Sequence, residues 1–160
     1  VKTVIHALSV AALLLAFAIA VLSHSKSVGD IANEKMAKDV PYISYTKTSF
    51  EELLAGNDPL FVDMTASWCI TCQVNERVAL YTDATQALFK TYHVQYVVGD
   101  WTNQNPDITA FLAHYGRNGV PLYVYYGPRD SKTGQRPKPQ VLPQLLTNGL
   151  VADVIEGTSD

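Results

Sequence analysis

The sequence has few cysteines and no excess of basic residues, and both scarcities narrow the possible functions. Its 160 residues include two cysteines, 12 lysines and arginines, and 15 aspartates and glutamates. A small secreted domain held together by disulfides would carry several cysteine pairs spread along the chain. A nucleic-acid-binding domain would carry a concentrated basic patch, whereas the basic residues here are scattered. Both classes are excluded, and the length suits one domain with an appendage.

One long apolar run stands near the N-terminus. Residues 4–22 read VIHALSVAALLLAFAIAVL. A helix of this length, at ~1.5 Å per residue, covers nearly the ~30 Å hydrocarbon core of a bilayer. We expect residues 1–23 to form a transmembrane helix or signal anchor, either alone or as the last helix of a larger membrane domain. A cleaved signal peptide, suggested by Ala18 and Ala20, and a buried core helix are the alternatives.

The rest of the chain divides into a linker and one folded domain. Residues 24–45 are polar with mixed charge, and we assign them to a linker with one short helix over 31–38. The domain is expected to cover residues 46–160. Ser49 and Glu52 have the spacing of a helix capping box, which predicts where its first helix begins.

Hydrophobic periodicity and capping residues predict alternating helices and strands within this domain. Asn105 followed by Pro106 is a typical helix start, and Thr147 or Asn148 can cap the last helix. We expect helices over 50–55, 69–78, 82–92, 106–115 and 150–155, and strands over 60–64, 94–98, 122–126 and 139–142. This order predicts an α/β fold with a mixed central sheet flanked by helices.

Both cysteines lie in the stretch TASWCITCQVNE, residues 65–76. A strand, a short turn and W-C-x-x-C at a helix start place Cys69 where free backbone N–H groups and the helix dipole favour a thiolate. Cys72, three residues later, lies on the same helical face and within disulfide reach. We expect Cys69 to act as the nucleophile of a dithiol that closes reversibly.

Two other interpretations of the cysteine pair stay open. A zinc or copper site normally needs more ligands, but the chain has no second C-x-x-C, and His93 and His114 show no ligand-like spacing. Alternatively, the two cysteines are inert core residues. Disulfide exchange is the favoured interpretation, and it needs neither a metal nor an organic cofactor.

Two acidic residues near the cysteines are candidate site residues. Asp63 interrupts the apolar strand LFVDM, where a charge is costly unless it is paired or protonated. A buried Asp63 with a raised pKa would take the proton of Cys72 during exchange. A solvated position at a strand edge is the alternative. Glu76, one helical turn after Cys72, either tunes the same site or is an ordinary solvated residue.

The tripeptide Gly119-Val120-Pro121 comes directly before the strand expected over 122–126. Proline is permitted at the first position of a strand, which is the simplest explanation. A cis bond before Pro121 would instead let the Val120 backbone face a partner chain.

Together, these blocks resemble the thioredoxin superfamily and, more narrowly, the C-terminal periplasmic domain of the DsbD family of thiol:disulfide interchange proteins. The resemblance covers residues 44–157. It rests on FVDMTASWCITCQVNERVAL, VVGDWTNQNPDI, GRNGVPLYVYY and PQVLPQLLT. It implies a thioredoxin-like fold that accepts electrons from a cysteine pair in a membrane domain and passes them to periplasmic disulfides.

The resemblance also implies a role for each candidate residue. Cys69 would attack and Cys72 would resolve, Asp63 and Glu76 would adjust their pKa values, Pro121 would be a cis-proline beside the dithiol, and Trp68 would flank the site. The implied location is the bacterial inner membrane with the domain in the periplasm. An anchored reductase for cytochrome c maturation is the enzymatic alternative, and a thiolate metal-binding module is the alternative from another class.

Overall fold

The computed structural model describes residues 40–157. The transmembrane helix expected over 1–23 and the short helix expected over 31–38 lie outside the described residues. Within 40–157, no helix combines the length and the hydropathy needed to cross a membrane.

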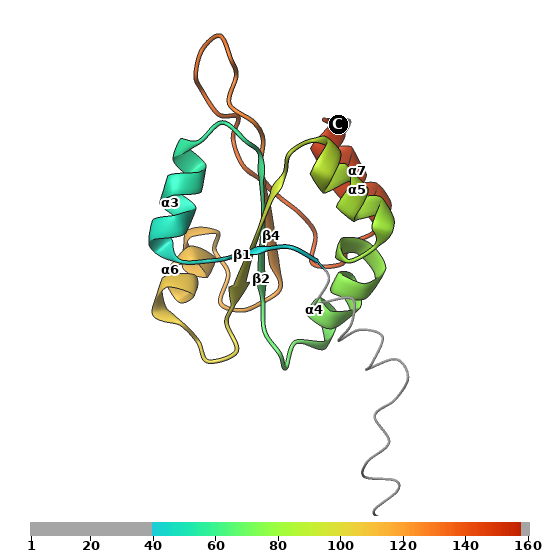
Figure 1. Ribbon diagram of the computed structural model, residues 1–160. Helices are drawn as coiled ribbons and strands as arrows, with labels where there is room; N and C mark the ends of the chain where they lie inside the picture. The colour runs from blue at the N-terminus through green and yellow to red at the C-terminus, as the bar shows by residue number, and fades with distance from the viewer. Residues whose placement is uncertain (1–39, 158–160) are drawn as a thin grey trace, which may run out of the picture. The chain divides into compact units, whose positions relative to one another are not determined.

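A five-stranded mixed sheet forms the centre of the domain (Figure 1). The strands are β1 (Ile43–Ser44), β2 (Leu60–Thr65), β3 (Gln95–Asp100), β4 (Leu122–Tyr126) and β5 (Gln140–Val141). Their spatial order is β1-β3-β2-β4-β5, with β1, β3 and β2 parallel and β4 antiparallel to both β2 and β5. The strand that precedes the cysteines, β2, is therefore paired on both sides.

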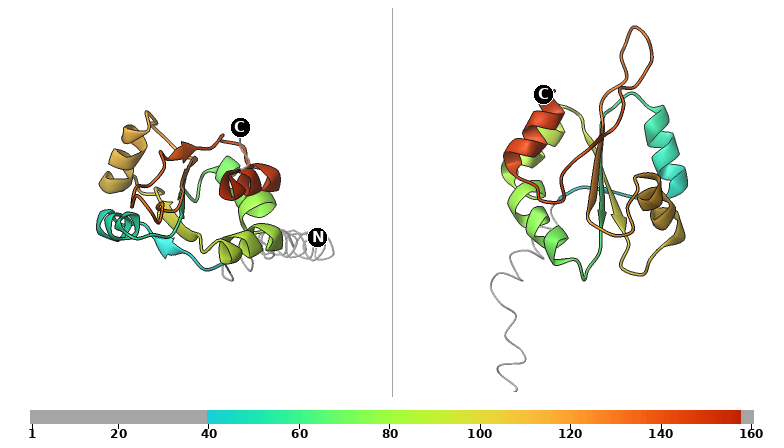
Figure 2. Two further views of the ribbon diagram at one scale, coloured as in Figure 1. Left: turned by 90° about the horizontal axis from the view of Figure 1, so that it is seen from above. Right: turned by 180° about the vertical axis from the view of Figure 1, so that it is seen from behind.

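Helices cover both faces of this sheet, as Figure 2 shows from two further directions. The helices are α3 (Lys47–Ala55), α4 (Ile70–Asn75), the π-helix η1 (Glu76–Leu80), α5 (Asp83–Thr91), α6 (Pro106–His114) and α7 (Asn148–Glu156). The helices α3 and α6 pack on one face, and α4, η1, α5 and α7 lie on the other (Figure 1). The expected mixed sheet flanked by helices is confirmed.

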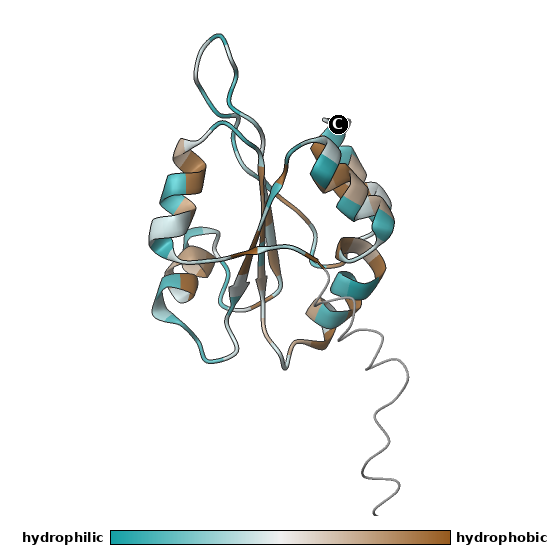
Figure 3. Ribbon diagram, viewed as in Figure 1, coloured by the Kyte–Doolittle hydropathy of each residue, from teal (hydrophilic) through white to brown (hydrophobic). Residues whose placement is uncertain are grey.

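Alternation along β2 separates two hydrophobic cores. Leu60, Val62 and Met64 belong to the core beneath α3 and α6, whereas Phe61 belongs to the core beneath η1, α5 and α7. Asp63 is two residues after Phe61 on the same strand, so its side chain points to the face covered by η1, α5 and α7. Hydrophobic segments follow the central strands in Figure 3, where the surrounding helices alternate between hydrophobic and hydrophilic segments.

Three local features differ from the sequence-based expectation. The strand β1 lies in the stretch expected to be linker, and it pairs with β3. The first helix begins at Lys47 rather than 50, because Thr46 is its N-cap and Ser49 its third residue. Thr46 and Ser49 bond reciprocally in the capping box, so the predicted box of Ser49 with Glu52 is wrong.

The helix expected over 69–78 is two segments. The α-helix α4 ends at Asn75, and η1 continues with an i→i+5 hydrogen bond from the Tyr81 N–H to the Glu76 carbonyl. This wider turn brings residues five apart to one side of the helix, so that Asn75 and Leu80 are both buried.

Candidate active site

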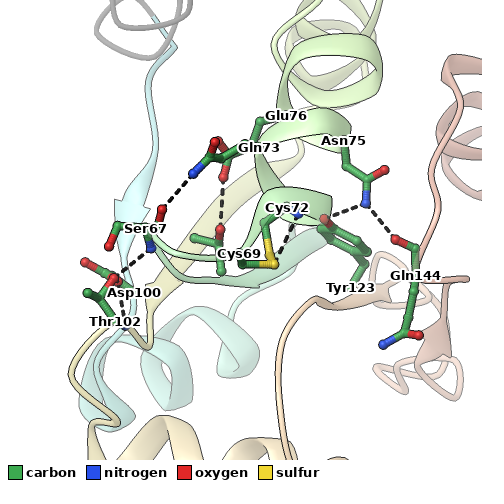
Figure 4. Close-up of a disulfide and its surroundings, with 11 residues drawn as sticks. Ser67, Cys69, Cys72, Gln73, Asn75, Glu76, Asp100, Thr102, Tyr123 and Gln144 are labelled. Carbon is green, nitrogen blue, oxygen red and sulfur yellow. Dashed lines mark hydrogen bonds between the residues drawn. A yellow bond between two sulfur atoms is a disulfide. The ribbon is translucent and has the colours of Figure 1, made fainter. Parts of the chain in front are cut away.

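The two cysteines lie at the start of α4, directly after the loop that leaves β2 (Figure 4). A disulfide joins Cys69 and Cys72, whose Cα atoms are 5.3 Å apart. The pair is therefore placed for the reversible closure expected from its spacing.

The two sulfur atoms have different environments. Cys69 is the N-cap of α4, and its Sγ accepts a hydrogen bond of 3.2 Å from the backbone N–H of Cys72. Cys69 is 6% exposed, whereas Cys72 is completely buried. An N–H donor at a helix start stabilises a thiolate, and only Cys69 has access to solvent. This asymmetry fits Cys69 as the attacking cysteine.

The loop before Cys69 is tied to the segment after β3. The Ser67 N–H donates to the Thr102 hydroxyl at 2.8 Å, and the Trp68 indole N–H donates to the Thr102 carbonyl at 3.2 Å. Trp68 also lies against Trp101, with ring centroids 6.0 Å apart, but stays 53% exposed. Trp68 therefore flanks the dithiol, in a fixed position and open to solvent.

The Val120-Pro121 peptide bond is cis, as the resemblance implied. Val120 packs against the small cluster formed by Ala66, Cys69 and Cys72, so the start of β4 lies beside the dithiol. The simplest explanation, a proline that merely opens a strand, is thus incomplete.

Asp63 is fully buried in the middle of the sheet, and the alternative of a solvated strand edge is wrong. The Tyr96 hydroxyl donates a hydrogen bond of 2.7 Å to its Oδ2, while Oδ1 has no partner within the described part of the chain. Burial raises the pKa of Asp63 to about 7, although the bond from Tyr96 opposes the rise. The carboxyl thus titrates near neutral pH.

Glu76 acts electrostatically on Asp63 and is partly buried rather than fully solvated. Its Oε1 accepts a hydrogen bond of 3.0 Å from the Thr65 hydroxyl. Burial raises the pKa of Glu76, and its charge adds to the rise in the pKa of Asp63. The structure therefore brings the two predicted acids together on the side of the sheet covered by α4.

The comparisons with known proteins agree with this geometry. A family model described as thioredoxin-like matches residues 43–128, more than half of the chain. The chain belongs to the thioredoxin-like family. Its β2-loop-α4 unit, with the cysteine pair and the cis-proline, lies within the matched residues.

A curated relative is the thiol:disulfide interchange protein DsbD 1 of Pseudomonas aeruginosa, 33% identical over 77 residues. The match covers 48% of this chain but 13% of the relative's length. Among solved structures, the reduced C-terminal domain of Neisseria meningitidis DsbD is 18% identical with a TM-score of 0.54, covering 73% of this chain and 100% of that domain. A thioredoxin from Thermus thermophilus has a TM-score of 0.54 at 16% identity, covering 74% and 88%.

These structures show that the thioredoxin-like domain has the same fold as the DsbD C-terminal domain and as thioredoxins. The fold, the cysteine pair and the DsbD relative together support a thiol:disulfide oxidoreductase.

The site of this thioredoxin-like domain also contains buried polar residues that sequence reasoning missed. Asn75 donates from Nδ2 to the Tyr123 hydroxyl at 2.9 Å and to the Gln144 carbonyl at 2.7 Å (Figure 4). Its Oδ1 accepts from the Leu146 N–H at 3.0 Å. One signal was available: Asn75 follows Cys72 by three residues, so both lie on the sheet-facing side of α4. Tyr96, the donor to Asp63, carried no comparable signal.

Residues 40–157 contain no group of three or more histidine, cysteine or acidic side chains placed to hold a metal ion. His93 and His114 are both exposed.

Proposed function

We propose that this protein is a membrane-anchored periplasmic disulfide reductase, which takes electrons from a cysteine pair in a membrane-embedded donor and passes them to periplasmic proteins. The observation that carries the proposal is the asymmetric dithiol. Cys69 has an N–H donor and is partly accessible to solvent, while Cys72 is completely buried.

In the first step, the Cys69 thiolate attacks one sulfur of a partner disulfide. A mixed disulfide forms, and the other partner sulfur leaves as a thiolate that takes a proton from water. Val120 packs against the cluster that contains Cys69, and Trp68 precedes Cys69 in the chain, so both would contact the partner chain near the reacting sulfur. Pro121, through its cis bond, sets the direction of the Val120 backbone.

In the second step, Cys72 resolves the mixed disulfide. Its thiol gives a proton to the Asp63 carboxylate, and the resulting thiolate attacks the Sγ of Cys69. The Cys69–Cys72 disulfide closes, and the second partner sulfur leaves as a thiolate. Two electrons pass from the dithiol to the partner disulfide. Glu76, beside Asp63, disfavours a second negative charge and so adjusts the pH at which this step runs.

The membrane donor would restore the dithiol by the same chemistry in reverse, and no cofactor takes part. The support for this direction of electron flow, for the periplasmic location and for the anchor over 1–23 is the similarity to DsbD. That similarity covers a small part of the relative, so donor and acceptors are to be identified by experiment.

A trapping experiment tests the proposal. In the Cys72→Ala variant of the full-length chain, produced in bacterial cells and quenched with acid, Cys69 is expected to hold a mixed disulfide with its partner. The adduct should vanish on reduction and should be missing from the Cys69→Ala, Cys72→Ala control. If the chain is folded and exported yet no Cys69-dependent adduct forms, the proposal is wrong.

The identity of the trapped partner separates the proposal from its two alternatives. A periplasmic disulfide isomerase or a general redox protein fits the reductase, whereas an apocytochrome indicates a role in cytochrome c maturation. A thiolate metal-binding module would instead retain stoichiometric zinc or copper after purification under reducing conditions, which metal analysis detects.

A further inference from the structure

The two oxygens of the Asp63 carboxyl are not equivalent. Oδ2 accepts the hydrogen bond from the Tyr96 hydroxyl, and Oδ1 is a buried oxygen to which none of the residues 40–157 donates. An unpaired buried carboxyl oxygen is costly, and a redox or catalytic role is one explanation for its presence in a folded protein. The structure thus distinguishes an anchored oxygen from one that is free to accept.

The donor to Oδ2 is held rigidly. Tyr96 is 4% exposed, and its ring packs against Phe89 and Phe61 with centroids 5.3 and 6.3 Å apart. It stands on β3, where its register partner on the parallel strand β2 is Phe61, two residues before Asp63. The hydroxyl therefore meets Asp63 from a fixed direction rather than by a side-chain rearrangement.

We propose that Tyr96 is a positioning residue of the exchange reaction: its hydroxyl anchors Oδ2 of Asp63 and leaves Oδ1 as the atom that accepts the Cys72 proton. This inference rests on the proposed function. The proton moves from the Cys72 sulfur to Oδ1, and Tyr96 donates its hydrogen bond before and after the transfer without losing its own proton.

Several other ionisable groups share this part of the core. They are Tyr123 on β4, Glu76 in η1 and Tyr81 directly after η1, whereas Cys72 on α4 is buried in a separate cluster with Ala66 and Cys69. The helices α5 and α7 meet the same core mainly through apolar residues. Tyr96 is the group among them that bonds to Asp63, and burial raises its pKa well above the ordinary value, so it stays protonated as a donor.

The direction of the effect follows from the hydrogen bond. A donor stabilises the carboxylate more than the protonated acid, so the Tyr96 hydroxyl lowers the pKa of Asp63 against the effect of burial. Without it, the pKa of Asp63 rises further, and at neutral pH less of the carboxylate is ready to take the Cys72 proton. The resolving step should then require a higher pH.

The test compares Tyr96→Phe with Tyr125→Phe in the reduced full-length chain. Tyr125 is also a buried tyrosine of the same core, but it makes no bond to Asp63. Dithiobis(nitrobenzoic acid) serves as the disulfide, because attack by Cys69 and resolution by Cys72 each release one coloured thiolate. The rate of the second release is measured by stopped flow as a function of pH.

We expect the midpoint of this profile to rise by about one pH unit in Tyr96→Phe, which makes resolution up to about tenfold slower below the midpoint. Tyr125→Phe should keep the native midpoint, and Asp63→Asn should lose the inflection. NMR titration of the Asp63 carboxyl carbon reads the same shift directly, even if the variant is less stable.

Two results would overturn the inference in distinguishable ways. If Asp63→Asn loses the inflection but Tyr96→Phe keeps the native midpoint and carboxyl titration, Tyr96 only packs, and the proposed function stands. If the native chain shows no second release that depends on Cys72, the proposed function fails, and the inference with it.

Discussion

The two faces of the central sheet differ in what they bury. The core beneath α3 and α6 consists of hydrophobic residues, among them Val62, Met64 and Leu112. The opposite face holds Asp63, Asn75 and Thr85, which are the buried polar residues other than tyrosines within 40–157. The same strands contribute side chains to both faces, and successive residues of a strand point to opposite faces. Asp63 therefore lies on the face opposite to that of Val62 and Met64.

This difference indicates that the two faces have different roles, one in stability and the other in exchange chemistry. The apolar face stabilises the sheet by burial, and nothing on it needs to change protonation during exchange. The polar face carries the dithiol helix and retains a carboxyl whose charged form is costly in the core. We therefore expect substitutions on the two faces to separate stability from redox chemistry.

The largest effect should come from Asp63→Asn, which changes both the stability and the redox chemistry of the domain. The folded-state pKa of about 7 lies above the unfolded value of 3.8, so the folded chain keeps a proton that the unfolded chain releases. The contribution of Asp63 to stability is then fully present below about pH 4 and is lost as the pH rises to about 7. The total loss is on the order of 4 kcal/mol, at about 1.36 kcal/mol per pKa unit.

In Asp63→Asn this loss should be missing, so the variant is expected to be more stable than the native chain at about pH 8 but slower in exchange. Urea unfolding at about pH 5 and pH 8 measures the first effect, and reduction of insulin disulfides measures the second. The exposed Asp58→Asn is the matched control. A variant that exchanges at the native rate would reduce Asp63 to a structural residue.

A substitution on the apolar face should have the opposite profile. Leu112→Ala on α6 removes a side chain that is 1% exposed, and such a truncation costs about 2–5 kcal/mol. The pH profile of the resolving step should stay native, because none of the groups around Asp63 is touched. Urea unfolding and stopped-flow exchange on one preparation check both halves. A shifted profile would show that the two faces are coupled.

Local signals explain which elements could be predicted from the sequence. The strand β4 has the predicted bounds, since LYVYY is a short β-branched and aromatic run directly after a proline. The helix α6 begins at Pro106 as predicted, because Asn105 accepts from the N–H groups of Asp107 and Ile108. Asp63 could be identified because an acidic residue within an apolar strand is unusual, and this is visible in the sequence without knowing its bonding partner.

The missed features depend on contacts between distant parts of the chain. The strand β1 is two residues long, too short for any alternation, and exists because β3 offers it an edge. Tyr96 bonds to Asp63 across 33 positions, and Asn75 bonds to Tyr123 across 48. Neither pairing follows from periodicity, because the first depends on the register of β3 against β2 and the second on how α4 packs against β4.

The smallest effect should come from Asn75→Ala, which tests whether the polar face also fixes the shape of the site. The variant leaves the Tyr123 hydroxyl, the Gln144 carbonyl and the Leu146 N–H without their bonds to α4, at a cost of about 1–3 kcal/mol. The Leu146 amide should exchange with solvent faster than in the native chain. The matched control is Asn148→Ala, which removes one bond, to Thr82. If the two variants lose equal stability and Leu146 stays protected, then Asn75 does not hold this loop, and the order of the dithiol helix depends on apolar packing alone.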